Sequence, residues 1–576
     1  MDRETMMALL SVAKGTSRPD LTIKNARIVD VFTESIREGL SVAIKDGFIV
    51  LVDTTCPEGQ EVIDASGLYL CPGLIDAHTH LDSLFSFHEF VPYAIRGGTT
   101  TVVTECAMVA CACGMKGVEA FLESTAGYPI RCFFVVPPLT PPFPQAEGCK
   151  GITLRGFKRL LRLKEALGVG EAYWTRIVEG DERVIEQACY AISLQKRLDG
   201  HASGAKGRKL GQYIVTGITS CHESVTPEEA LEKIGSGLYV MIREGFVRRE
   251  LEALAPLRAL KDKRRLILVS DSFDACMLLE GYMDKIVREA IELGFSPIEA
   301  IKMATLNPAE YHGLRHLGAI APLRKADILF LSDLEKMRIE KVMFEGSIVF
   351  SEGRFLREQV PFSYPEEFQR TIRSGPFYER DFTIAGPKHA RGIRVIEVVN
   401  ETITKERRVP GLPDRESMGS QDIAICSVIN RQRARRYSLG FLKGTGIREG
   451  AVATSVTWDT GNIVAVGSSP KDLRTAVEKV RQIQGGYVVA KGDRVLLEFP
   501  MPVFGLLSLE KMGAIAERTR RFEEATREIG CTLKRPFLTL QVLPFTGLPF
   551  LRITDKGLFD VKEKRLLSPF LFSEEL

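Results

Sequence analysis

Histidine and tryptophan are scarce in this chain, with eight and two copies among its 576 residues. No apolar run approaches the roughly 20 residues that a membrane-spanning helix needs. The N-terminal segment MDRETMMALLSVAKG carries acidic residues, and its apolar part is too short for a secretory signal. We therefore expect no membrane association and a cytoplasmic location.

Charge of one sign is not in excess either, because the formal net charge is only +3. A nucleic-acid or membrane-binding surface usually carries a strong positive excess. The sequence therefore predicts neither partner, and the basic run RQRARRYS (431–438) is expected to face solvent. The twelve cysteines form no repeated CxxC pair, which is typical of reduced thiols rather than of a disulfide framework.

A mass of 64.0 kDa predicts several domains. Short strands are expected in residues 21–70, and similar material returns at 326–350. Between them, apolar strand-like runs alternate with helical stretches at 226–237 and 296–314. About 250 residues of such alternation favour a (β/α)₈ barrel, although a doubly wound open sheet would produce a similar pattern. The predicted buried strands are TTTVVTECA, IRCFFVVPPL, QYIVTGITSCHES, GLYVMIREG and RRLILVSDS.

The predicted fold class is α/β, with the barrel joined to two smaller units. Residues 1–70 and 319–360 are expected to build a small composite β-sandwich domain around a barrel at 71–318. A linker rich in Pro, Ser and Gly (360–382) leads into a C-terminal mixed α/β domain, predicted at 376–576.

Two of the eight histidines stand one residue apart, in CPGLIDAHTHLDS (71–83). In an extended strand, side chains at i and i+2 project from the same face. His78 and His80 can therefore close on one ion, since neutral imidazole is the commonest metal ligand. A pair of hydrogen-bonded core histidines would give the same local pattern, so the rest of the chain has to decide.

Further ligand-type side chains follow the predicted strands, and barrel enzymes place their chemistry at the C-terminal ends of strands. Each of these residues alone has an ordinary structural explanation. Together they offer four imidazoles and two carboxylates, which is enough for two divalent ions with room for water. The predicted metal ligands are His78, His80, Glu171, His201, His222 and Asp271.

The motif PGLIDAHTHLDS, followed by GGTTTVV, resembles the amidohydrolase superfamily, and the longer pattern resembles its adenine deaminase family. The similarity spans nearly the whole chain and includes the C-terminal domain peculiar to that family. The similar segments include GVGEAYW, GHASG, GITSCHESVTPEEALEKIGSGLYVMIREG, LILVSDSF, MATLNPAEYHGLRHLGAIAPLRKADILFLSDLE and LGFLKGTGIREGAVATSV. The resemblance implies a metal-dependent (β/α)₈ barrel that deaminates adenine.

The resemblance also implies a role for each ligand. His78, His80 and Asp271 match the ligands of the first ion, and His201 and His222 match those of the second. Glu171 matches the bridging carboxylate, which in many superfamily relatives is a carbamylated lysine. Asp271 is expected to carry protons between the attacking water and the leaving group, so the predicted catalytic residues are Asp271, Glu171 and His222.

The chain departs from the family where the substrate ring is expected. The family usually carries a DPHEIAN-type sequence where this chain has ECAMVAC (105–111), so that Ala107 and Met108 replace a His-Glu pair. Glu105, Met108 and Phe246 are the predicted substrate-binding residues. SVTWDTGN (455–462) stands where the family tends to have AHDSHN, so the metal ligands are kept while the pocket wall changes.

Three interpretations remain open at this point. The first is an aminohydrolase acting on adenine or on a related aminated ring. The second is a hydrolase of cyclic amides or N-acyl compounds, and the third is a catalytically idle binding protein. The expected cofactors are two divalent ions, Mn²⁺ or Fe²⁺, with Zn²⁺ as the alternative. We also expect a small-molecule substrate such as a purine base. Neither a nucleic acid nor a membrane is expected as a partner, and the expected oligomeric state is a homodimer.

Overall fold

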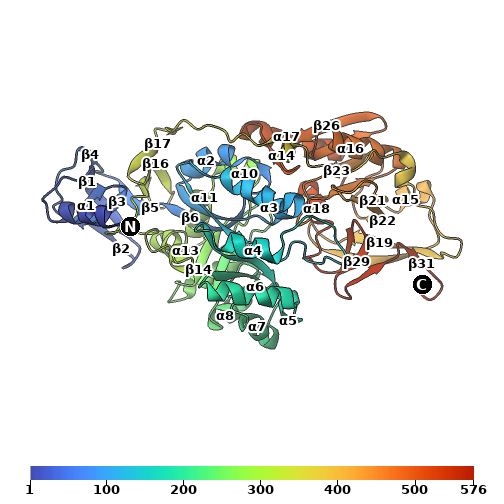
Figure 1. Cartoon of the computed structure of the whole chain (residues 1–576), viewed down its shortest axis with the longest axis horizontal. Helices are drawn as coiled ribbons and strands as arrows, with labels where there is room; N and C mark the ends of the chain where they lie inside the picture. Colours follow the sequence, from blue (N-terminus) through green and yellow to red (C-terminus); the bar gives the residue numbers. More distant parts are fainter. Residues whose placement is uncertain (1, 576) are drawn as a thin grey trace.

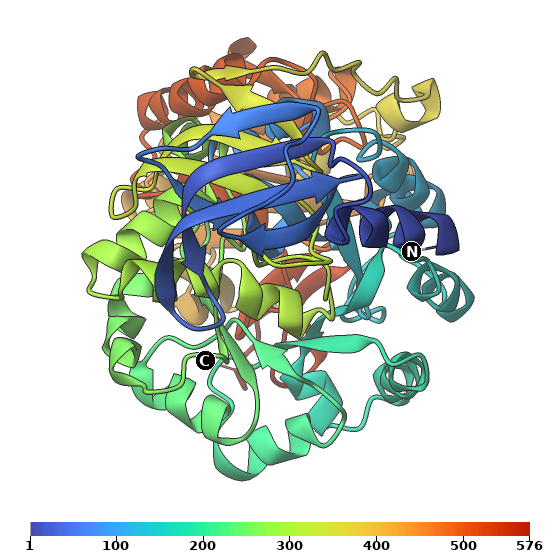
Figure 2. The ribbon, with the colours of Figure 1, turned by 90° about the vertical axis from the view of Figure 1, so that its left-hand side faces the viewer.

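The computed structural model describes residues 2–575 and divides into three packed parts (Figure 1). A β-sheet at the N-terminal end lies on one side of a central α/β barrel, and a second α/β domain lies on the other side. Figure 2, which views the molecule from the N-terminal end, shows this sheet in front of the barrel. None of the helices in residues 2–575 combines the length and apolarity that crossing a bilayer requires.

The N-terminal sheet is built from two separated parts of the chain. Its nine strands run in the order β18-β17-β16-β15-β5-β1-β2-β3, with β4 pairing β1. Ile23, Ile28 and Phe330 form part of its own buried core. The strands are β1 (Leu21–Asp30), β2 (Ser35–Lys45), β3 (Phe48–Asp53), β4 (Glu61–Asp64), β5 (Tyr69–Pro72), β15 (Ile328–Asp333), β16 (Arg338–Phe344), β17 (Ser347–Ser351) and β18 (Arg354–Phe355).

Eight parallel strands form the barrel, which confirms the predicted fold class. The ladders run β11-β10-β9-β8-β6 and β12-β13-β14. The ring is closed by Asp271 N donating to His78 O at 3.0 Å and Thr219 N donating to Leu198 O at 3.0 Å. The strands are β6 (Leu74–His80), β8 (Thr99–Glu105), β9 (Arg131–Val136), β10 (Ala166–Tyr173), β11 (Arg197–His201), β12 (Ser220–Cys221), β13 (Tyr239–Arg243) and β14 (Leu266–Val269).

Each barrel strand is followed by helical structure that covers its outer side (Figure 1). Thr226 caps the N-terminus of its helix by accepting from Glu229 N at 3.3 Å, with Pro227 in the first turn as predicted. The main helices are α2 (Phe87–Arg96), α3 (Ala107–Glu123), α4 (Leu154–Leu161), α6 (Glu182–Ser193), α7 (Gly207–Ile214), α8 (Pro227–Gly235), α11 (Met283–Glu292), α12 (Pro297–Met303) and α13 (Leu306–Tyr311).

Two of the sequence predictions were wrong in detail. The run QYIVTGITSCHES (212–224) was predicted as one strand, but its beginning completes α7, and β12 contains only Ser220 and Cys221. The Leu210 and Tyr213 side chains are buried at helical spacing, and a short apolar run cannot distinguish a buried helix from a strand. The predicted helix at 296–314 is divided into α12 and α13 at Ala304 and Thr305.

The C-terminal domain is a nine-stranded sheet with a helix on each face. The strand order is β20-β19-β22-β21-β24-β23-β25-β26, and β31 (Phe570–Leu571) pairs β19. One face packs on α16 (Pro470–Gln482) and the other contributes to the core that contains α17 (Met512–Glu528). The strands are β19 (Gly392–Val398), β20 (Thr404–Pro410), β21 (Ile423–Ile429), β22 (Tyr437–Lys443), β23 (Ala451–Thr454), β24 (Ile463–Gly467), β25 (Gly486–Lys491) and β26 (Arg494–Pro500).

The C-terminal domain is joined to the barrel by several direct contacts. The short strand β27 (Leu507–Ser508) pairs with β7 (Leu84–Phe85), which follows the HTH motif. The loop after β9 is also held, because Gly148 N donates to Asp555 Oδ1 at 2.8 Å. Glu147 is fully buried there and accepts from Phe143 N at 2.9 Å and from Thr546 Oγ1 at 2.8 Å. One hydrophobic core runs through both parts.

Glu147 predicts a pH dependence of stability at this junction. Burial raises the pKa of Glu147 to about 7, so the folded state binds more protons than the unfolded state between about pH 4.5 and 7. Ionised Glu147 therefore costs stability as the pH rises through this window. We expect the unfolding free energy of Glu147→Gln, relative to wild type, to rise by about 1–3 kcal/mol between pH 5 and 8.

Urea unfolding at the two pH values measures this difference. Glu563→Gln, at a more exposed carboxylate on the surface of the C-terminal domain, serves as the control and should show no such change. If the unfolding free energy of Glu147→Gln relative to wild type is the same at pH 5 and pH 8, Glu147 has the same pKa in the folded and unfolded states.

Candidate metal centre

The barrel strands bring five of the six predicted ligands close together at one end. His78 and His80 lie on β6 and, as the i, i+2 spacing predicts, both reach the same carboxylates. His78 Nε2 lies 3.3 Å from Glu171 Oε1 and 3.4 Å from Asp271 Oδ1. The corresponding distances for His80 Nε2 are 3.4 and 3.5 Å. His222 Nε2 lies 3.2 Å from Glu171 Oε1.

His201 is the sixth predicted ligand and lies on the far side of Glu171. It is the last residue of β11. Its Nδ1 lies 3.6 Å from Glu171 Oε2 and 3.2 Å from His222 Nε2. Glu171 therefore turns one oxygen towards His78 and His80 and the other towards His201.

The donor atoms form two overlapping groups, each compact enough to hold a divalent ion. The first consists of His78, Glu171, His222 and Asp271, and the second of His201, His222 and Glu223. His78 Nε2 is buried and has no hydrogen-bond partner among the described residues, although two carboxylate oxygens lie near it. An orphaned ring nitrogen facing carboxylates fits a metal ligand, and the donor set of imidazole and carboxylate suits Zn, Mn and Fe.

The charges at this site compensate one another. Burial opposes a charge on His78, but the nearby Asp271 and Glu171 carboxylates raise its pKa to about 10. Burial would raise the pKa of Glu171, but hydrogen bonds from His222, His78 and His80 hold it well below its usual range. Protons on imidazoles thus balance the carboxylates, and metal binding would release such protons.

Asp271 is held in a conformation that the sequence does not reveal. Its φ is 60°, in the left-handed region that a non-glycine residue adopts at a cost of about 1–3 kcal/mol. Its backbone N–H donates a hydrogen bond to His78 O, which holds Asp271 next to β6. Strain of this kind persists where the surrounding structure determines it, as at active sites.

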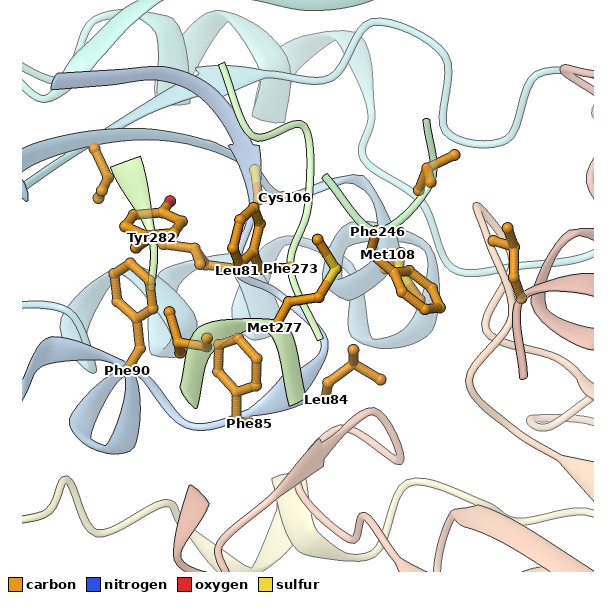
Figure 3. Close-up of a cluster of buried hydrophobic side chains, with 14 of the residues drawn as sticks. Leu81, Leu84, Phe85, Phe90, Cys106, Met108, Phe246, Phe273, Met277 and Tyr282 are labelled. Carbon is orange, nitrogen blue, oxygen red and sulfur yellow. The ribbon is translucent and has the colours of Figure 1, made fainter. Parts of the chain in front are cut away.

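A cavity opens beside His80 and Glu171, between the barrel and the C-terminal domain. It contains all three predicted substrate-binding residues, Glu105, Met108 and Phe246. Met108 and Phe246 are 4% and 8% exposed and lie at the edge of the buried cluster in Figure 3. The remaining lining residues include Leu84, Leu139, Tyr173, Phe273, Trp458, Asp459, Gln541 and Phe545.

Glu105 links this cavity to the metal ligands. It ends β8 and its Oε1 accepts from Glu171 N at 2.8 Å. Gly170 makes room for it, because a Cβ at that position would lie 2.2 Å from Glu105 Oε1. Burial, followed by the nearby negative charge of Glu171, raises the pKa of Glu105 to about 8.

Comparison with known sequences assigns the two main parts of the chain. The Amidohydrolase family pattern matches residues 69–349, and the Adenine deaminase C-terminal domain pattern matches residues 401–565. The chain is 36% identical to an adenine deaminase from Archaeoglobus fulgidus over 574 residues, covering 98% of both proteins. The chain belongs to the adenine deaminase family. Relatives named adenine deaminase from Kosmotoga olearia and Dehalococcoides mccartyi are 33% and 34% identical, with at least 97% of each protein covered.

Membership in the adenine deaminase family makes the chain a hydrolase acting on carbon–nitrogen bonds in a metal-dependent superfamily. Several residues at the site were not predicted from the sequence. Glu223 belongs to the second donor group, Tyr173 packs edge-on against His201, and Trp458 lies parallel to His80. The motif HES (222–224) could have indicated Glu223, because it places a carboxylate directly after the predicted ligand His222. The position of Trp458 beside His80 depends on tertiary packing and has no such local pattern.

Arg243 is the other missed residue, and it supports the ligands from behind. Its guanidinium is 3% exposed and pairs with Glu223, with Glu250 at 2.8 Å and with Asp271 Oδ2 at 3.4 Å. One buried cation thus pairs with three carboxylates. Breaking a buried ion pair from one side leaves uncompensated charge and is strongly destabilising.

We expect Arg243→Met to lower the unfolding free energy by about 3–5 kcal/mol at neutral pH. Adding Glu250→Gln should restore part of the loss, because one of the unpaired carboxylates is removed. Urea denaturation measures both values, with Arg264→Met as the control at an exposed pair with Asp262. A loss below about 1 kcal/mol would mean that solvent, rather than Arg243, balances these carboxylates.

Proposed function

We propose that the chain is a binuclear metal-dependent aminohydrolase that converts adenine and water into hypoxanthine and ammonia. The observation that carries this proposal is the convergence of His78, His80, His201 and His222 on Glu171, with Asp271 nearby, beside a cavity that several aromatic side chains line. The full-length relatives named adenine deaminase support adenine as the substrate.

Glu171 would contribute to both ions, and His222 would join the ligands of the second one. His78, His80 and Asp271 would complete the first site, and His201 the second. Ions bound there would supply Lewis acidity and a water molecule that loses a proton near neutral pH. Mn²⁺ or Fe²⁺ is our proposed cofactor and Zn²⁺ the alternative, since all three accept imidazole and carboxylate ligands.

Asp271 has the geometry for the proton transfers. Its Oδ2 faces Arg243, while Oδ1 faces His78 and His80 at 3.4 and 3.5 Å. The oxygen on the ligand side can accept the proton of the attacking water and deliver it to the departing amino nitrogen. A C–O bond then forms at C6 as the C–N bond breaks, and nitrogen leaves as ammonia.

Glu105 can hydrogen-bond the ring from the same side, since Glu171 N already fixes one of its oxygens. Met108 and Phe246 would pack against the ring without polar contacts. This apolar wall is the observation that favours the second candidate, which is hydrolysis of another aminated heterocycle, a cyclic amide or an N-acyl compound. A homodimer and a cytoplasmic location remain part of the proposal.

Metal analysis tests the binuclear site. Protein supplied with Mn²⁺ should hold about two ions per chain by elemental mass spectrometry. His78→Ala and His201→Ala should each lower this number, because each removes a donor from a different group. His389→Ala, at an exposed histidine, is the matched control. Full occupancy in both site variants would contradict the assignment of these ligands.

Ammonia release tests the reaction. Mn²⁺-loaded protein should release ammonia and hypoxanthine from adenine in equal amounts, and Asp271→Asn should lower kcat by a factor on the order of 10²–10⁴. Adenine binding should change little in that variant, whereas Met108→Glu should preserve or improve turnover. Release of ammonia from another amine or amide, but not from adenine, would withdraw adenine and leave the metallohydrolase assignment intact.

A further inference from the structure

The C-terminal domain contributes one wall of the substrate cavity. Trp458, Asp459, Gln541 and Phe545 line it opposite Glu105 and Met108. The Trp458 and His80 rings are nearly parallel, at 12°, with centroids 6.2 Å apart. This wall therefore reaches the side chains that we assign to the metal.

Trp458 is held in a single orientation. Its backbone N–H donates to Gln541 O and its Nε1 donates to Gln541 Oε1, both at 3.0 Å. Gln541 is itself fixed, because its Nε2 donates to Tyr487 Oη at 2.7 Å. With its only side-chain donor used, Trp458 has just its flat apolar faces to offer a ligand.

Asp459 is held in a strained backbone conformation beside Trp458. Its φ is 61°, and the following turn is fixed by Thr457 Oγ1 donating to Asn462 O at 2.7 Å. Asn462 Nδ2 in turn donates to Gly148 O of the barrel at 2.9 Å. The loop is thus fixed to both parts of the molecule, as a pre-organised binding residue requires.

The Asp459 carboxylate is incompletely paired. It is 6% exposed, and Oδ2 accepts from Tyr173 Oη at 3.1 Å. Oδ1 receives no hydrogen bond from any residue within the described part of the chain. No lysine or arginine of that part lines the cavity either. An unpaired carboxylate oxygen on a residue that lines a cavity without a cation can accept a hydrogen bond from a neutral N–H donor.

We propose that Asp459 is a specificity-determining residue that accepts a hydrogen bond from a ring N–H of the substrate, while Trp458 packs against the ring. The ligand class is a planar neutral heterocycle with an unsubstituted ring N–H, because no lysine or arginine among the described residues lines the cavity to pair with an anion. This inference rests on the proposed function, which sets the orientation of the ring. The reacting carbon faces the metal ligands, and the N–H edge faces Asp459.

The test compares adenine with 9-methyladenine, which lacks the N–H, in Mn²⁺-loaded wild type and in Asp459→Gly. Glycine adopts a φ of 61° without strain. Wild type should prefer adenine by at least about tenfold in kcat/KM. Asp459→Gly should lose most of this preference through a higher KM for adenine, with its metal content and kcat nearly unchanged.

Asp493→Gly, at an exposed aspartate of the same domain, is the matched control and should keep the full preference. If Asp459→Gly does not fold, Asp459→Ala tests the same point, because it removes both acceptor oxygens. An adenine preference that survives in the folded variants overturns the inference.

A binding measurement separates this inference from the proposed reaction. In a Trp174→Phe background, Trp458 is the only tryptophan, so its fluorescence reports ligand binding without turnover. Tighter binding of adenine than of 9-methyladenine, lost in Asp459→Gly, supports the inference even if no ammonia is released. Equal binding of the two ligands, or no adenine binding, overturns it, whereas absent turnover alone overturns only the proposed reaction.

Discussion

The burial of Glu171 and Asp271 among imidazoles is the constraint on which the rest of the site depends. Two carboxylates in a closed space need positive charge within a few ångströms, because burying an unpaired charge is very costly. Histidines from β6, β11 and the residue after β12 surround Glu171, and Arg243 balances Asp271 from behind. Divalent cations are the natural partners of such a set, since they add charge where imidazole lone pairs and carboxylate oxygens meet.

The C-terminal domain is part of this arrangement. It pairs a strand with the chain just after the HTH motif and places Trp458 parallel to His80. The same domain hydrogen-bonds the loop after β9 through Asp555. A binding cavity at the end of the barrel therefore has one wall from the strands that carry the ligands and one from a domain whose residues are hundreds of positions away in the sequence. Water exclusion and substrate recognition then depend on the packing of the two domains.

Sequence alone was sufficient for the features that local periodicity encodes. The i, i+2 spacing of His78 and His80 on an extended strand led directly to their shared carboxylate partners, and the βα alternation led to the barrel. The same reasoning failed at QYIV, where an apolar run suits a buried helix as well as a strand. Trp458 and Asp459 could not be placed from the sequence, because 286 residues separate Asp459 from its partner Tyr173. The left-handed conformation of Asp271 is likewise imposed by tertiary contacts.

The most direct test of the central claim is anomalous diffraction from crystals of the protein grown with Mn²⁺. The account predicts two peaks in the anomalous difference map, one on each side of the Glu171 carboxylate. The first should lie among His78, His80 and Asp271, and the second beside His201 and His222. The absence of any peak at Glu171, with these side chains hydrogen-bonded to one another instead, would contradict the assignment of this cluster as a metal centre.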